Sequence, residues 1–366
     1  MYANMLDSSN SIETESGEVK IIGTGNGIGY VNVYYSTGNG YGYGMYAQDF
    51  SSNAITATGS GKVTVSGIGN DNVGATSNGF GYGMYATLFG SSNSITTDSG
   101  EVKITGTGYG DGRNDGSGYG SGYGSGYGMY AVEFGSNTIT TGSGKVIVSG
   151  DAAGNDNVCG YGMNAVDEGG INSITTTSGD VEVTGTGGTN YYPSSHPNDN
   201  IGGYGMRAGT AKYGYDNTSS NSIKTESGHI TVTGTGDNSN GYGMHASYGG
   251  SNEIEATVDG NVTVNGYGNG DGDGYGMYAD DAGFSWNANS NDIKTKSGWV
   301  EVTGTATGSG DGYGMRAVGS NISNSIKTES GRVAVSGEGD RFGFGMLANN
   351  TDTLSYDTVS TDIKTK

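Results

Sequence analysis

Two carboxylates in this sequence are spaced as the catalytic acids of a solenoid enzyme would be. Asp273 and Asp311 each lie two residues before the tyrosine of a recurring Gly-Tyr-Gly-Met motif, in successive copies of that motif. Stacking of successive copies would bring the two side chains to about 5 Å, the carboxylate separation of retaining glycosidases. The preceding copy has Asn240 and the following copy has Phe342 at this position, so no third acid extends the column. We therefore expect no catalytic residue, and a β-helix polysaccharide-degrading enzyme is the least favoured function.

Calcium is the one metal that these acids suggest. The segment Gly270-Asp271-Gly272-Asp273-Gly274 is similar in composition to the Gly/Asp nonapeptides that bind calcium in β-rolls. The regular nine-residue period of those repeats is missing, so we expect no obligatory cofactor. The calcium candidates are Asp271, Asp273 and Asp311.

Other reactive side chains have no partner at a useful spacing. We expect His196, His229 and His245 in a loop or at outward strand positions, without the paired spacing of zinc ligands. Cys159 is the single cysteine, so no internal disulfide can form. The serines that precede glycine recur in nearly every repeat, which turn formation explains, whereas a nucleophile would occur once. The sequence thus predicts a chain that is not an enzyme.

Seven tyrosines are candidates for contact with a partner. They lie in long segments rich in Gly, Ser and Asn, where aromatic area on an adaptable polar backbone is typical of protein or glycan recognition. These residues are Tyr30, Tyr34, Tyr35, Tyr119, Tyr123, Tyr191 and Tyr192. The alternative is that the segments are solvated spacers, or that they fold back on the shaft or on a neighbouring fibre.

Composition excludes several classes of protein. The chain has 366 residues with 75 Gly, 2 Pro and 32% apolar residues, too few to fill a conventional globular core. A net charge of −21 with 16 basic residues argues against binding to nucleic acid or anionic lipid. No apolar run is long enough for a membrane helix, and the first residues lack the pattern of a signal peptide.

A repeated unit organises the whole chain. A Gly-Tyr-Gly-Met-x-Ala motif recurs with its methionines 31 to 45 residues apart, and an Asn-Ser-Ile-x-Thr-x-Ser-Gly segment and an x-Val-x-Val/Ile-x-Gly segment follow each copy. Three short strands cannot bury their faces alone, whereas identical units stacked about 4.8 Å apart pair every strand with its copies above and below. We therefore predict an all-β fold without helices, a parallel, right-handed, three-sided β-helix of about nine coils.

Strand alternation predicts which side chains form the core. The residue after the motif Met varies from Tyr46 to Arg207 to Leu347, which one core could not accept, so this position is expected to face outward. The residues then expected to face inward are Tyr43, Met45, Ala47, Ile95, Thr97, Val102 and Ile104. By this parity the motif tyrosines, from Tyr43 to Tyr313, form a stacked aromatic column in the core.

Two further columns support the stacking. An asparagine recurs two residues before the isoleucine of the second strand, as expected for amides that hydrogen bond along the axis. Its copies are Asn10, Asn53, Asn93, Asn137, Asn172, Asn221, Asn252, Asn291 and Asn324, and Thr361 replaces it in the last repeat. On the outer face Glu18, Lys62, Glu101, Lys145 and Asp180 occupy one position in successive repeats, so neighbours of opposite charge should pair.

The unit I-x-T-x-S-G-x-V-x-V-x-G resembles the coils of bacterial β-helix surface proteins, the filamentous-haemagglutinin-like and autotransporter-passenger adhesins. The resemblance covers nearly the whole chain. It implies a non-enzymatic, extracellular rod at the bacterial cell surface that contacts glycans or surface proteins. We expect residues 1–366 to be one solenoid segment, uncapped at both ends and part of a longer array, with copies of itself or further repeats as end-to-end partners. The alternative is a self-assembling filament or sheath subunit.

Overall fold

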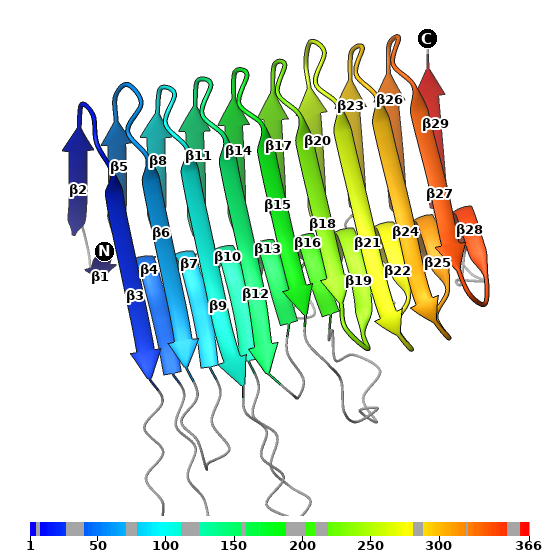
Figure 1. The fold of residues 1–366 in the computed structure, drawn as a ribbon, viewed down its shortest axis with the longest axis horizontal. Helices are drawn as coiled ribbons and strands as arrows, with labels where there is room; N and C mark the ends of the chain where they lie inside the picture. The colour runs from blue at the N-terminus through cyan, green and yellow to red at the C-terminus, as the bar shows by residue number, and fades with distance from the viewer. Residues whose placement is uncertain are drawn as a thin grey trace, which may run out of the picture.

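The computed structural model describes residues 1–4, 8–26, 40–70, 79–110, 124–154, 159–167, 169–187, 202–209, 219–280, 288–319, 321–349 and 359–365. These residues form 29 β-strands and no helix, and so none that could cross a membrane. The strands follow one another in order along the long axis, with the two chain termini at opposite ends (Figure 1).

Each strand belongs to one of three sheets. Sheet A consists of β1 (Tyr2–Asn4), β4 (Gly40–Gln48), β7 (Gly79–Thr87), β10 (Gly124–Val132), β13 (Cys159–Val166), β16 (Gly202–Gly209), β19 (Asn240–Ser247), β22 (Gly274–Asp280), β25 (Gly312–Val318) and β28 (Gly343–Asn349). Sheet B consists of β2 (Ser9–Thr14), β5 (Ser52–Ala57), β8 (Ser92–Thr97), β11 (Ser136–Thr141), β14 (Ile171–Thr176), β17 (Ser220–Thr225), β20 (Ser251–Ala256), β23 (Asn289–Thr295), β26 (Ile322–Thr328) and β29 (Val359–Thr365). Sheet C consists of β3 (Val19–Asn26), β6 (Val63–Asn70), β9 (Val102–Gly110), β12 (Val146–Gly154), β15 (Val181–Gly187), β18 (Ile230–Gly236), β21 (Val262–Gly270), β24 (Val300–Gly308) and β27 (Val333–Gly339).

Matching positions of successive repeats lie opposite each other in these sheets. Every strand pairs in parallel with its counterpart in the next coil, so that Met129 is matched with Met84 on one side and Met163 on the other. Nine coils of three strands follow one another, and β28 and β29 come after them. The predicted parallel, three-sided β-helix of about nine coils is confirmed.

The core is a narrow column of methionine, isoleucine and valine. Met129 of sheet A, Ile139 of sheet B and Val148 of sheet C are each 0% exposed and belong to one cluster that runs through the stack. Burial of one such side chain stabilises the fold by about 1.5–3 kcal/mol. The expected burial is confirmed for Met45, Ala47, Ile95, Thr97, Val102 and Ile104.

The predicted asparagine ladder lies inside the coils. Each Nδ2, from Asn10 to Asn291, donates a hydrogen bond to Oδ1 of the next asparagine at 2.8–2.9 Å. The same amide also donates, at 2.6–2.8 Å, to the carbonyl of the residue after the motif Met, in sheet A. Thr361 is matched with Asn324 in the last strand pair. The ladder therefore ties coil to coil and sheet B to sheet A.

Glycine allows sheets A and C to meet backbone to backbone. A Cβ added to Gly67 of β6 would lie 1.9 Å from the carbonyl oxygen of Tyr82 in β7. One added to Gly106 of β9 would lie 1.9 Å from that of Tyr127 in β10. No side chain fits between the sheets at this level, which explains how a chain with so few apolar residues can be closely packed.

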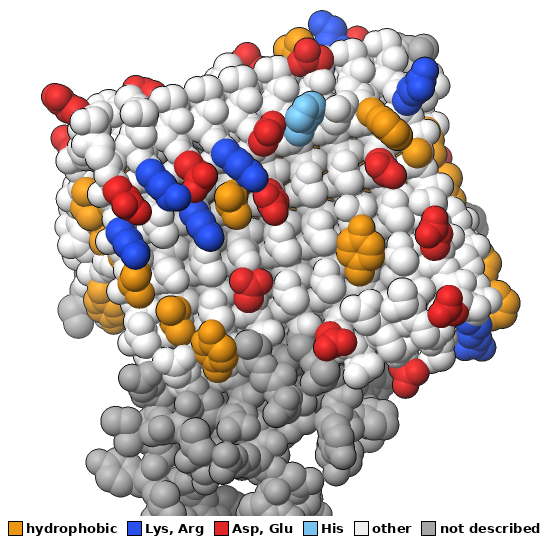
Figure 2. Space-filling model, in the orientation of Figure 1, with side chains coloured by type: hydrophobic (Ala, Val, Ile, Leu, Met, Phe, Trp, Pro, Cys, Tyr) orange, Lys and Arg blue, Asp and Glu red, His pale blue; other side chains and the backbone are white. Residues whose placement is uncertain are grey.

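Charged side chains on the outer face of sheet C gather beside the turns from sheet B, and most of the remaining face is uncharged (Figure 2). Lys62 pairs with Glu101 at 2.8 Å, as the column of alternating charge predicts. Lys145 pairs at 2.9 Å with Glu182, a residue outside that column. All four side chains are more than a third exposed, so each pair contributes about 0–1 kcal/mol.

Substitution of one ladder asparagine should destabilise the middle of the rod. Asn172→Ala leaves the Nδ2 of Asn137, the Oδ1 of Asn221 and the carbonyl of Asn164 without their partner. We expect a loss on the order of 3 kcal/mol in the free energy of unfolding, because buried polar groups lose their hydrogen bonds. Urea denaturation, with the outer-face variant Ser173→Ala as control, would measure it. Equal stability of the two variants would contradict a structural role for the ladder.

Candidate functional site

The outer face of sheet A carries the largest array of stacked aromatic side chains. Its tyrosine column consists of Tyr43, Tyr82, Tyr127, Tyr161, Tyr204, Tyr242, Tyr275 and Tyr313, and ends with Phe344. Neighbouring rings are stacked with centroids 4.7–5.2 Å apart and planes within 4–12° of each other. The coil repeat thus equals a favourable distance between aromatic rings.

Six residues of the tyrosine column are at most 8% exposed, but five of these pack in a cluster separate from the column of methionine, isoleucine and valine. The column is therefore buried as predicted, whereas the prediction that Tyr43 faces inward beside Met45 is wrong. Gly44 separates it from Met45, and a Cβ on Gly44 would point into the core, 2.5 Å from Cγ1 of Val65. Two consecutive positions therefore face inward, which shifts the alternation of the strand by one residue. The rings of Tyr43 and Tyr46 lie 4.8 Å apart, on the same outer side.

A second column, the mixed column, runs beside the tyrosines. It consists of the residues after the motif Met, namely Tyr2, Tyr46, Tyr85, Tyr130, Asn164, Arg207, His245, Tyr278, Arg316 and Leu347. The position lies outside the core, as predicted. Asn164 and His245 are nevertheless only 2% and 3% exposed, because neighbouring side chains cover them. From the fifth coil onward polar groups therefore interrupt the aromatic column.

The two arginines of the mixed column lie against tyrosine rings. The guanidinium of Arg207 is 5.8 Å from the ring centre of Tyr161 and 5.9 Å from that of Tyr204. The guanidinium of Arg316 is 4.7 Å from the ring centre of Tyr313, and its Nη1 donates to the hydroxyl of Tyr275 at 2.8 Å. Cation–π contact of this kind stabilises by about 0.5–2 kcal/mol. The tyrosine column thus holds both cations in place.

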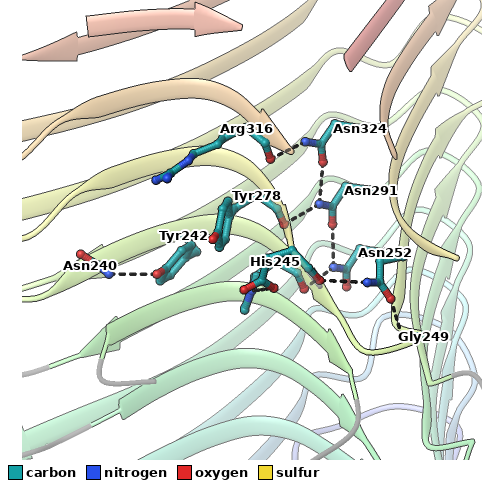
Figure 3. A network of polar contacts seen from close by, with 11 residues as sticks. Asn240, Tyr242, His245, Gly249, Asn252, Tyr278, Asn291, Arg316 and Asn324 are labelled. Carbon is teal, nitrogen blue, oxygen red and sulfur yellow. Dashed lines mark hydrogen bonds and ion pairs between the residues drawn. The ribbon is translucent and has the colours of Figure 1, made fainter. Parts of the chain in front are cut away.

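His245 is a buried ionisable group of this face, 3% exposed. Its ring stacks with Tyr242 at 5.0 Å and with Tyr278 at 5.2 Å, and its Nε2 lies 3.0 Å from Oδ1 of Asp280. Figure 3 shows the rings side by side, with the asparagine ladder beyond them. Among the residues that the structure describes, its buried Nδ1 has no hydrogen-bond partner. The sequence placed His245 at an outward position but gave no signal for its burial, because Asp280 lies one coil away and two residues along.

The aspartates considered for catalysis and calcium serve the tyrosine column. Asp273 accepts a hydrogen bond from the hydroxyl of Tyr275 at 2.6 Å and one from the backbone N of Asp311 at 2.7 Å. Asp311 accepts one from the hydroxyl of Tyr313 at 3.0 Å. Asp271 accepts one from Ser309 at 2.6 Å. No group of three or more metal-ligating side chains occurs among the described residues. A calcium site at Asp271, Asp273 and Asp311 stays a prediction.

Several predicted residues cannot be placed on this face. The partner-binding candidates Tyr30, Tyr34, Tyr35, Tyr119, Tyr123, Tyr191 and Tyr192 lie outside the described residues, as does His196. Cys159 begins β13, two residues before Tyr161, and its side chain is half-buried. The geometry of the candidate site therefore rests on the two columns of sheet A.

The stacked phenols resist ionisation. Burial, together with the neighbouring phenols of Tyr85 and Tyr2 and the carboxylate of Asp49, raises the pKa of Tyr46 to about 12. Burial first, and neighbouring phenols second, also hold the pKa of Tyr82 and Tyr242 well above the ordinary value of 10. Desolvation disfavours the phenolate in each case. The hydroxyls are thus hydrogen-bonding groups rather than nucleophiles.

Comparison of the chain with family models, curated proteins and solved structures found no match. The chemistry of the face therefore follows from its geometry. Because each ring covers the faces of its neighbours, and six of the eight tyrosines are at most 8% exposed, the column itself offers little free surface. The aromatic side chains that reach the surface of sheet A are Tyr2 and Tyr41, with Tyr46, Tyr85 and Tyr130 partly exposed. Such an arrangement can hydrogen bond and contact a partner, but it contains no activated nucleophile.

The glycine between the motif Tyr and Met should be required in every coil that has a further coil on each side. A Cβ at Gly205 would lie 2.5 Å from Cγ1 of Val232 and 2.7 Å from the carbonyl oxygen of Gly243. At Gly345, the same motif position in the last coil, the nearest atom is 3.4 Å away, on Val335. We expect Gly205→Ala to lower stability by about 1–3 kcal/mol, and Gly345→Ala by about 0.5 kcal/mol or less. Thermal unfolding of both variants would test this, and equal losses would contradict it.

Stability should fall in strong base. Above pH 10 the tyrosines of the unfolded chain ionise, whereas a folded phenol such as that of Tyr46 keeps its proton until about pH 12. Below pH 10 the phenol is protonated in both the folded and the unfolded chain, so it adds no pH dependence to the free energy of unfolding. Between pH 10 and about 12 only the unfolded chain loses the proton, and the free energy of unfolding therefore falls. Urea denaturation over this range, with phenolate absorbance recorded in parallel, would measure the slope. Tyr82→Phe should flatten it, and phenols that titrate at pH 10 without loss of structure would refute the stacked column.

Proposed function

We propose that this chain is a non-enzymatic structural segment of an extracellular bacterial surface protein, a stiff acidic rod whose sides serve adhesion. The observation that carries this proposal is the continuous axial order, because the strand pairing, the asparagine ladder and the tyrosine column all extend through successive coils. All three add contacts along the axis, and none brings reactive groups together. The resemblance of the repeated unit to bacterial surface adhesins supports the same function.

Rod-like behaviour is expected from the way coils contact each other. Each coil contacts the coils before and after it through three strand pairs, so bending would strain many hydrogen bonds at once. The chain reaches this order with a single cysteine and hence without a disulfide of its own. A net charge of −21 favours a hydrated, soluble rod. These properties suit a spacer that projects from a cell.

Adhesion is supported by the chemistry of sheet A. Tyrosine and arginine are enriched where proteins bind partners, because they combine apolar area with hydrogen-bonding groups. Arg207 and Arg316 stand among tyrosines on one outer face. Tyr41 and Tyr2 on the same sheet are 44% and 61% exposed. A glycan or a surface protein that lies along the rod would meet the partly exposed rings of Tyr46, Tyr85 and Tyr130 in three successive coils.

Hydrolysis of a polysaccharide has less support. Both Asp273 and Asp311 accept a hydrogen bond from the tyrosine two residues further along the chain, which gives each carboxylate a structural role. A second candidate function, assembly into a filament or sheath, is favoured by two complementary surfaces at opposite ends of the rod.

Electron microscopy and an adhesion assay would test the proposal together. Purified residues 1–366 should appear as rods of constant width, with about 45 Å of length for nine coils of about 4.8 Å each. Cells that display the chain should be retained on glycan-coated or protein-coated surfaces several-fold more than cells that do not. Compact particles of variable shape would refute the rod. Polysaccharide turnover that Asp273→Asn abolishes would refute the non-enzymatic assignment.

A further inference from the structure

A groove of about 410 Å³ runs along the outer face of sheet B in the last four coils. Its sides are formed by side chains of β20, β23, β26 and β29 and of the residues that follow these strands. The charged residues that line it are Lys294, Lys296, Lys327, Lys364, Glu255 and Glu329. We call it the lysine groove, because four of the six charged residues that line it are lysines.

Lysines stack on lysines in this groove. Lys294, Lys327 and Lys364 occupy one position in three successive strands. Earlier in sheet B the same position pairs opposite charges, as between Lys224 and Glu255 at 2.8 Å. Like charges directly opposite each other on a sheet are destabilising. The change from alternating to repeated charge therefore disfavours the isolated rod and favours an anionic occupant.

Few of these ammonium groups have a carboxylate partner. Lys294 pairs with Glu253 on the same face. Within the part of the chain that the structure describes, Lys296, Lys327 and Lys364 form no ion pair. Four lysines and two glutamates line the groove, so it carries an excess of positive charge in a chain whose net charge is −21. A partner with apolar groups and carboxylates side by side would suit this groove, because the methylene chains of the lysines can contact the apolar groups while the ammonium groups pair with the carboxylates.

A ridge with the opposite properties lies near the other end of the rod. Phe50, Phe89 and Phe134 stand at the turns from sheet A to sheet B in coils two to four, and are 53%, 56% and 37% exposed. Their rings are stacked, with centroids 6.4 and 5.3 Å apart. Asp49 and Glu133 directly precede two of them. This phenylalanine ridge is therefore exposed and aromatic, with two carboxylates beside its rings.

The ridge is maintained against local strain. Phe50 and Phe134 have φ angles of 56° and 65°, in the left-handed region that residues with a side chain seldom adopt. The equivalent residue of the seventh coil is Gly249, which adopts a φ of 81° without such strain. In an isolated rod, phenylalanine at this position is unfavourable for two reasons: its φ angle is strained, and its apolar ring is exposed to water. Burial of the rings in a contact would offset both effects.

We propose that the phenylalanine ridge of one copy of this chain binds in the lysine groove of a second copy. Both features run along the coil axis with the same coil repeat, one an exposed aromatic row flanked by carboxylates, the other a groove lined mainly by lysines. They lie in coils two to four and in coils seven to ten, so one rod cannot bring its own ridge and groove together. The contact is heterologous, and repetition gives a staggered lateral assembly that does not close. It goes beyond the adhesive role and does not depend on it.

Two loss-of-contact variants and their mixture test this assembly. K296E/K327E reverses charge in the groove, and F50N/F89N/F134N removes the ridge with a residue that tolerates positive φ. K20E/K103E makes the same change of charge on the exposed outer face of sheet C and is the control. Circular dichroism would verify that every variant folds, and sedimentation would give the mass distribution over a range of protein concentrations.

We expect wild type and K20E/K103E to form a concentration-dependent series above the 37.1 kDa monomer, weakened by salt. Each loss-of-contact variant should remain monomeric, and an equal mixture of the two should stop at a dimer, because only one intact groove and one intact ridge can meet. Monomeric wild type, or assembly that survives in either variant, would overturn the proposal. Monomeric wild type that binds polygalacturonate, with binding lost in K296E/K327E, would assign the groove to an acidic polysaccharide instead.

Discussion

The spacing of about 4.8 Å between parallel paired strands is the constraint on which the rest of this structure depends. It sets every side chain against its own counterpart in the next coil, so each position must hold a residue that tolerates itself as a neighbour. Asparagine does so by hydrogen bonding and tyrosine by stacking, and both recur in nearly every repeat. Lysine does not, and Lys62 accordingly faces Glu101. The lysine groove departs from this rule, which is why it indicates a partner.

The thin core follows from the same constraint. Main-chain pairing along the axis supplies most of the order, so one column of methionine, isoleucine and valine is enough inside each coil. Elsewhere sheets A and C touch through glycines such as Gly67 and Gly106. Stability is accordingly distributed as a sum of contacts between neighbouring coils. A local defect should loosen the coils around it rather than unfold one central core.

The repeat predicted the fold and most of the core, because three strands per unit at a fixed order leave few alternatives to stacking. It did not predict the side on which the tyrosines lie. Strict alternation placed Tyr43 with Met45, but the absent side chain of Gly44 lets two successive positions face inward. The enclosure of His245 by Asp280 was also not predicted, because it depends on a diagonal contact between coils. The groove and the ridge were not predicted either. Each arises because lysines, or phenylalanines, from successive coils come to lie side by side, and this is seen only once the pairing register of the strands is known.

The asparagine ladder gives the rod a direction. Each side-chain amide donates to the coil that follows it, from Asn10 to Asn53 and onward to Asn324. Aligned amide dipoles add, as peptide dipoles do along a helix, and each bond polarises the next. Main-chain groups of a parallel sheet point alternately to both neighbours and largely cancel. The two directions along the rod axis are therefore not equivalent. A coil inserted in the reverse direction would bring two asparagine Oδ1 atoms together on one side and two Nδ2 groups together on the other.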